Sequence, residues 1–110
     1  MIFNRKVLLV EHQSNTYESI CEVLDRNGYE YHCVDRIRKA KEILRREHYD
    51  IILCDIKLPD GSGLELLELL DTYIMTTPFV ALTGSNDLDL LKKALSGGAS
   101  DFLTRPFNLQ

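Results

Sequence analysis

The chain has 110 residues, which is enough for one domain with a single hydrophobic core. Hydrophobic residues make up 45% and charged residues 27%, a balance that excludes a disordered segment. The net charge of -4 argues against non-specific binding of nucleic acid, and no apolar stretch approaches the roughly 20 residues of a membrane span. We therefore expect one cytoplasmic domain over residues 1–110, with no membrane segment and no direct contact to nucleic acid.

The first predicted strand is the apolar run at residues 6–10, and Glu11 and His12 lie at its carboxyl end. Ser14 or Asn15 is expected to cap the helix that follows. Residues spaced i, i+3, i+4 and i+7 form an apolar stripe along that helix: Tyr17, Ile20, Cys21 and Leu24.

A strand of mixed polarity is predicted at residues 29–34, where alternating polar side chains are typical of a sheet edge. Asp35 is expected to cap the next helix. The outer face of that helix interleaves basic and acidic residues, which indicates a solvated surface. Its inner side carries Ile37, Ala40, Ile43 and Leu44.

The central strand is predicted at residues 51–54, where an uninterrupted apolar run indicates burial on both faces of a sheet. Asp55 follows at the carboxyl end of this strand. A turn rich in proline and glycine, residues 59–63, leads into a predicted helix at 64–73. The inward side of that helix carries Leu66, Leu67 and Leu70.

The last two strands are predicted at residues 79–82, followed by Thr83, and at residues 99–103. Asn86 or Asp87 is expected to cap the helix between them. Its apolar positions, in helical register, are Leu88, Leu91, Ala94 and Leu95.

The alternation of strands and helices predicts parallel strands joined by right-handed crossovers, with helices on both faces. We expect a flavodoxin-like, doubly wound α/β fold with a five-stranded sheet in the order 2-1-3-4-5. A fifth helix should cover the last strand, but the chain reaches Gln110 first. We therefore expect a domain truncated before its final helix.

The cysteines, Cys21, Cys33 and Cys54, are odd in number and lack the spacing of a metal site. Cys54 lies within the central apolar run, where a thiol packs as a small hydrophobic group. We expect three reduced thiols, as in a cytoplasmic protein, rather than a disulfide or a redox role.

Polar side chains follow the carboxyl ends of the predicted strands, where open α/β sheets bind ligands. Strands one and three are neighbours in the expected order, so Glu11, His12 and Asp55 should meet, with Thr83 and Arg105 across the same pocket. Such a group can hold a metal ion and a phosphoryl group. Asp55 is the candidate nucleophile, because an aspartate can itself form an acyl phosphate.

These features make the chain resemble the receiver domain of bacterial two-component response regulators. The matching motifs are the acid after the first strand, Asp55 with residues 58–64, Thr83–Gly84, Gly98–Ala99 and Arg105–Pro106–Phe107. The resemblance covers essentially the whole chain. It implies that Asp55 accepts a phosphoryl group from a sensor histidine kinase or a phosphotransfer protein and so controls an output domain or partner protein. It also implies a homodimer surface on the fourth helix and fifth strand.

The resemblance further implies roles for individual residues. Mg²⁺ would be held by Glu11, Asp55 and the backbone carbonyl of Lys57. The Thr83 hydroxyl would bond the phosphoryl group while Phe102 turns inward, and Arg105 would pair with the phosphoryl oxygens. No enzyme activity is expected beyond the domain's own phosphotransfer and dephosphorylation.

Two positions depart from the family pattern. His12 stands where the family usually has a second acid, and imidazole is a poor ligand for a hard cation. We therefore expect weak Mg²⁺ binding, a preference for Mn²⁺ or Zn²⁺, or no bound metal. Arg105 replaces a lysine and has a bulkier, planar charge. Our hypothesis is that Arg105, Lys57 or protonated His12 partly replaces the metal, so that Asp55 is phosphorylated slowly or not at all.

Three functions remain open at this point. The first is a phosphorylation-dependent switch, favoured by Asp55, Thr83 and Pro106. The second is a pseudo-receiver, a constant interaction or dimerisation module without phosphate chemistry, favoured by His12 and Arg105. The third, a flavin carrier on the same architecture, lacks a phosphate-cradling loop after the first strand.

Overall fold

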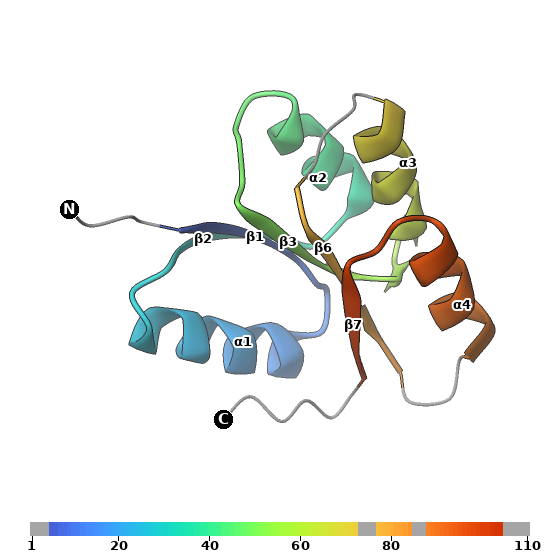
Figure 1. Ribbon diagram of the computed structural model, residues 1–110. Helices are drawn as coiled ribbons and strands as arrows, with labels where there is room; N and C mark the ends of the chain where they lie inside the picture. Colours follow the sequence, from blue (N-terminus) through green and yellow to red (C-terminus); the bar gives the residue numbers. More distant parts are fainter. Residues whose placement is uncertain (1–4, 73–76, 85–87, 105–110) are drawn as a thin grey trace.

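The computed structural model describes residues 5–72, 77–84 and 88–104, and in this part of the chain the main sheet has five strands. The sheet order is β2-β1-β3-β6-β7, and all neighbouring strands are parallel. This arrangement confirms the predicted doubly wound fold and its strand order (Figure 1). The strands are β1 (Lys6–Val10), β2 (Glu30–Val34), β3 (Ile51–Asp55), β6 (Phe79–Thr83) and β7 (Asp101–Thr104).

Helices cover both faces of the sheet, as predicted (Figure 1). Helix α1 packs on one face, and the other described helices pack on the opposite face. None of the helices in the described ranges has the length and apolar composition needed to cross a membrane. The helices are α1 (Ser14–Arg26), α2 (Ile37–Leu44), α3 (Leu64–Thr72) and α4 (Leu88–Ser96).

Alternate residues of the central strands supply two separate apolar cores. Val7 and Leu9 face α1, whereas Leu8 and Val10 face the core beneath the other helices. In β3 this alternation corrects the prediction of burial on both faces. Ile52 and Cys54 are fully buried, but Ile51 and Leu53 on the α1 face are only half-buried. Among the described helices, α1 alone packs against that face.

The helix caps differ from the predicted ones. Helix α1 has Gln13 at its N-cap position, and no described side chain caps it there, so Ser14 and Asn15 lie inside the helix. Helix α2 has Arg36 at its N-cap position, and Asp35 instead pairs with Lys39 at 3.0 Å. The predicted caps Asn86 and Asp87 of α4 lie outside the described residues.

The cap of α2 comes from the turn after β3. Asp60 accepts hydrogen bonds from the backbone N–H groups of Ile37 at 2.9 Å and Arg38 at 3.0 Å. The turn itself folds as a small antiparallel pair, β4 (Lys57–Leu58) with β5 (Gly61–Ser62), which the sequence pattern did not predict. Asp60 therefore ties the turn beside Asp55 to a helix distant in the sequence.

Helix α4 and strand β7 differ from the prediction in two further respects. Ala94 of α4 is fully buried as predicted, but Leu95 is 47% exposed and lies outside the core. Strand β7 begins at Asp101, two residues later than the predicted start at Ala99. The backbone N–H groups of Gly98 and Ala99 instead donate hydrogen bonds to carbonyl oxygens in the last turn of α4.

We expect Asp60→Ala to lower the free energy of unfolding by about 1 kcal/mol, because two N–H groups at the start of α2 lose their acceptor. Chemical denaturation with a two-state fit measures this loss. Asp60→Asn keeps one acceptor oxygen and should cost less. Asp35→Ala is the matched control, since it removes an exposed ion pair and should cost far less. A larger loss for Asp35→Ala would contradict the assignment of the cap.

The loss of stability in Asp60→Ala should also depend on pH. Partial burial raises the pKa of Asp60, but hydrogen bonds from the backbone N–H groups of Arg38 and Ile37 lower it by a larger amount. The net result is a pKa below the usual value of an aspartate. A depressed pKa adds stability above the unfolded pKa of about 4, and this stability is lost as the pH falls through the folded value. The difference between the parent protein and Asp60→Ala should therefore shrink in acid.

Candidate functional site

The candidate site lies where β1 and β3 end side by side. Val10 pairs with Cys54 in the parallel register, so the next residues, Glu11 and Asp55, emerge together at the carboxyl edge of the sheet. Glu11 is 3% and Asp55 is 1% exposed. Ligand atoms of Glu11, His12 and Asp55 all lie within 4.8 Å of one another. The structure thus brings together the three residues that the sequence placed here.

Backbone N–H groups orient both carboxylates. Oε1 of Glu11 accepts hydrogen bonds of 3.0 Å from the N–H groups of His12 and Gln13, in the turn that leads into α1. Oδ1 of Asp55 accepts one of 3.0 Å from the N–H of Lys57. The second oxygen of Asp55, Oδ2, is the one that faces His12.

His12 supplies a nitrogen between the two acids. Its Nδ1 atom lies 3.5 Å from Oδ2 of Asp55 and 3.7 Å from Oε1 of Glu11. The imidazole remains one-third exposed, whereas the side chains of both acids are buried. Two buried carboxylates repel each other, and a cation or a protonated imidazole between them offsets that repulsion.

The donor set fits a divalent metal ion. One imidazole nitrogen and two carboxylate oxygens lie close enough to converge on one ion. This nitrogen-containing set suits Mn²⁺ or Zn²⁺ better than Mg²⁺, which prefers oxygen ligands alone.

Thr83 lies at the same edge of the sheet. Leu82 of β6 pairs with Asp55 of β3, so Thr83 is one residue beyond the register position of the aspartate. Thr83 is 2% exposed, and its hydroxyl donates to the carbonyl oxygen of Gly84 at 3.2 Å. Phe102 pairs with Ala81 and packs, half-buried, against the core on the side opposite α1.

One predicted site residue is not described. Arg105, with the following Pro106, lies outside the described residues, so its predicted place across the pocket stays a prediction.

Cys54 is fully buried and directly precedes Asp55 in β3. Burial, and then the charges of Asp55 and Glu11, raise the pKa of its thiol well above the usual range. The thiol donates to the backbone carbonyl of Asp55 at 3.2 Å. The prediction that Cys54 packs as a small buried group is confirmed.

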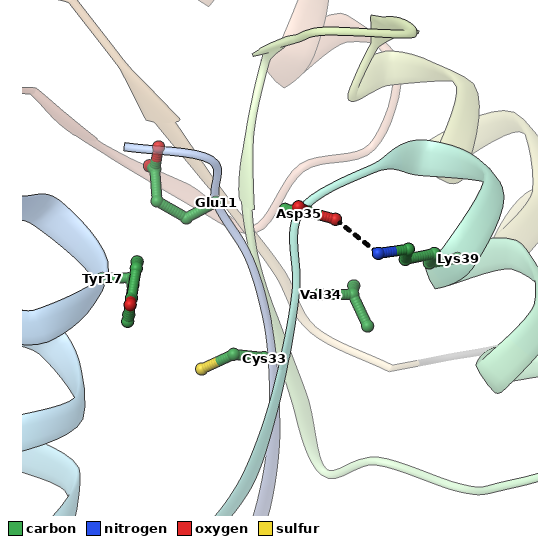
Figure 2. Close-up of a pocket in the computed structure, with 6 residues that line it drawn as sticks. All are labelled: Glu11, Tyr17, Cys33, Val34, Asp35 and Lys39. Atoms are coloured by element: carbon green, nitrogen blue, oxygen red, sulfur yellow. Dashed lines mark hydrogen bonds and ion pairs between the residues drawn. The ribbon is translucent and has the colours of Figure 1, made fainter. Parts of the chain in front are cut away.

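A pocket of about 350 Å³ opens beside Glu11, between α1 and α2 (Figure 2). Figure 2 shows Tyr17 and Cys33 on its α1 side, and the ion pair of Asp35 with Lys39 on the other side. The sequence pattern does not predict this pocket, because its walls come from α1, β2, α2 and the residue that follows β1, and no motif joins them.

Gly63 is a further residue that the sequence analysis did not single out for the site. Its N–H donates to the carbonyl of Ile56 at 2.7 Å, which folds the turn back over the end of β3. A Cβ atom at this position would collide with the backbone oxygen of Asp55 and lie 2.8 Å from Sγ of Cys54. Glycine is therefore needed here because of close backbone approach.

The acidic group lies at the carboxyl ends of adjacent parallel strands, at the switch point of a doubly wound sheet. A site at this position is typical of ligand-binding α/β domains. The chain belongs to one family of this class, the response regulator receiver domains, whose family model matches residues 7–110. In this family phosphorylation and Mg²⁺ binding are general features, and response regulators interact with histidine kinases and output domains.

Curated relatives agree with this assignment. The chain is 35% identical over 103 residues to the cell cycle transcriptional regulator CtrA of Caulobacter vibrioides, covering 94% of this chain and 45% of CtrA. It is also 35% identical over 105 residues to the response regulator protein PilR of Pseudomonas aeruginosa, covering 96% of this chain and 24% of PilR. The chain thus spans less than half the length of these relatives.

Solved structures share the same fold. A putative response regulator from Chloroflexus aurantiacus superimposes with a TM-score of 0.91 at 25% identity, over 98% of this chain and 90% of that chain. The receiver domain of a putative Luxo repressor protein from Vibrio parahaemolyticus gives a TM-score of 0.89 at 28% identity, over 97% of this chain and 82% of that chain.

We expect Gly63→Ala to destabilise the domain by about 2 kcal/mol, because the added methyl group meets backbone that cannot rotate away. The matched control is Gly84→Ala, whose added Cβ would meet no heavy atom within 4 Å and should change stability by less than about 0.5 kcal/mol. Urea unfolding of the two variants and the parent protein makes the comparison. Equal losses in the two variants would show that Gly63 is not sterically required.

Proposed function

We propose that this domain is a phosphorylation switch in which Asp55 accepts the phosphoryl group. The observation that supports this most is the position of Asp55, whose Oδ2 faces His12 while Oδ1 is held by the N–H of Lys57. The phosphoryl group would come from a sensor histidine kinase or a phosphotransfer protein. The phosphorylated domain would act on an output domain or a partner protein. We propose no catalysis beyond the domain's own phosphotransfer and dephosphorylation.

In the proposed reaction, Oδ2 of Asp55 attacks the phosphorus of a phosphohistidine. The new oxygen–phosphorus bond forms as the nitrogen–phosphorus bond breaks, and the leaving imidazole takes a proton from solvent. The Lys57 N–H orients the nucleophile throughout. Thr83 would turn its hydroxyl from Gly84 toward the phosphoryl group, and Arg105 would neutralise its charge.

A divalent metal would be held by Glu11, His12, Asp55 and the backbone carbonyl of Lys57, and would neutralise phosphoryl charge. We propose that the site binds Mg²⁺ weakly and prefers Mn²⁺, because His12 replaces an oxygen ligand by nitrogen. Phe102 would move only as part of the switch, since it already packs against the core.

We expect His12→Asp to raise the affinity for Mg²⁺ about tenfold and to lower the preference for Mn²⁺, because it replaces the imidazole nitrogen with a third carboxylate, a hard oxygen ligand. Isothermal titration with each metal measures both constants. His48→Asp is the matched control: it makes the same chemical change at a side chain 77% exposed, and should leave both affinities unaltered. Tighter Mg²⁺ binding in both variants would point to general charge rather than ligation.

For phosphorylation, we expect slow labelling by a small phosphodonor in Mg²⁺ and faster labelling in Mn²⁺. Asp55→Asn should abolish the label, and Asp89→Asn, an exposed acid on α4, should not change it. Intact-mass spectrometry over time gives the rates. Fast, stoichiometric labelling of the parent protein in Mg²⁺ would refute the proposed effect of His12.

The second candidate function is a pseudo-receiver, and His12 is the observation that favours it. The interaction surface would include α4 and β7, where Leu95 is 47% and Leu103 is 37% exposed. A homodimer through this surface would then form without phosphate. Absence of label with every metal, together with a dimer in sedimentation, would select this candidate over the first.

A further inference from the structure

Cys21 and Cys33 form a close pair of thiols outside the acidic site. Their Sγ atoms lie 3.3 Å apart, although the residues come from different elements, α1 and β2. Cys33 is exposed on the edge strand of the sheet, and Cys21 is half-buried on the helix that covers it. Both residues are free cysteines, as the sequence analysis expected.

We propose that Cys21 and Cys33 are a reversible dithiol–disulfide pair that fastens α1 to β2 when low-molecular-weight disulfides accumulate. This proposal departs from the expectation that the thiols have no redox role. A disulfide needs a sulfur–sulfur distance of about 2 Å, so the two atoms must approach by only about 1 Å. The inference does not depend on phosphorylation of Asp55.

The surrounding contacts hold the two elements in the required register. Tyr31 of β2 donates its hydroxyl hydrogen to Oδ2 of Asp25 at 3.1 Å, one helical turn beyond Cys21. Tyr17, one turn before Cys21, packs with it against the same apolar cluster. One hydrogen bond between the two elements and a shared apolar cluster therefore hold α1 against β2 beside the two sulfurs.

The bridge forms by two thiol–disulfide exchanges. The thiolate of Cys33, the more exposed residue of the pair, attacks an oxidised glutathione molecule, forms a mixed disulfide and releases one glutathione thiolate. The thiolate of Cys21 then attacks Cys33 in this mixed disulfide and releases the second. Two electrons pass to glutathione, and the two cysteine protons end on the released thiols.

The environment of Cys33 makes this reaction slow and selective. Burial, and then the hydrogen bond and charge of Cys21, raise the pKa of Cys33 to about 12, so thiolate is scarce at neutral pH. Exchange with a low-molecular-weight disulfide is therefore slow, on the scale of minutes to hours. Cys54 is out of reach of reagents because it is fully buried.

The position of the pair gives the bridge a consequence for the candidate site. Cys33 lies beside Leu9 in the sheet, and the next residue, Val34, accepts a hydrogen bond of 3.0 Å from the N–H of Glu11. Figure 2 shows the Cys33 sulfur on the wall of the pocket that also contains Glu11. The bridge therefore restrains the two elements, α1 and β2, that flank Glu11.

The test is incubation of the protein with oxidised glutathione, followed by thiol alkylation in denaturant and mass spectrometry. We expect loss of two alkylatable thiols, a peptide cross-link between Cys21 and Cys33, and full reversal by reduced dithiothreitol. The melting temperature should rise by about 10 °C on oxidation, because the bridge restricts the unfolded chain and a loop of roughly the length between Cys21 and Cys33 contributes about 3 kcal/mol. Amide hydrogens of α1 should exchange more slowly in the oxidised form.

Two variants provide the controls. In Cys21→Ser the exposed Cys33 should retain a stable glutathione adduct, because no second thiol displaces it, and the melting temperature should not rise. Asp55→Asn should oxidise at the same rate as the parent protein, which separates this inference from the proposed phosphorylation. Three free thiols after prolonged oxidation, a persistent glutathione adduct on the parent protein, or disulfides between chains would each overturn the proposal.

Discussion

The parallel pairing of β1 with β3 is the constraint on which the site depends. This pairing places Glu11 and Asp55 next to each other at one edge of the sheet, and apolar residues of both strands fill the cores below. A one-residue slip would turn Asp55 to the opposite face and send apolar side chains to solvent, so burial of the core fixes the register. The packing that stabilises the fold thereby also sets the spacing of the carboxylates.

The features that the sequence predicted correctly are those encoded by local pattern. Apolar runs and helical stripes determined the element order, and strand ends in an open α/β sheet determined that Glu11, His12 and Asp55 meet. The predicted cap of α2 was wrong for a physical reason. Asp35 has the right residue type at the right distance, but Asp60 reaches the same N–H groups from the turn after β3. Either carboxylate could cap this helix, and the tertiary fold places Asp60, rather than Asp35, within hydrogen-bonding distance of its first N–H groups.

Long-range juxtaposition explains the other differences. Leu95 has the helical register of a core residue, yet Ala94 beside it takes the inward position and leaves Leu95 exposed. Cys21 and Cys33 were treated as unrelated thiols because no spacing rule links a helix residue to an edge strand. Only the packing of α1 on β2 brings their sulfurs together. Arg105 lies outside the described residues, so its role remains a prediction from family pattern.

The charge balance of the site follows from His12. With an acid at this position, three carboxylates would surround a divalent cation, and the group would carry a net charge of about −1. With a neutral imidazole, two carboxylates and the same cation sum to about zero. The weaker field attracts the cation less, yet it also repels an incoming phosphoryl group less. Under the proposed function, His12 would therefore lower the affinity for the metal and also lower the repulsion of a dianion, while the Lys57 N–H orients Asp55.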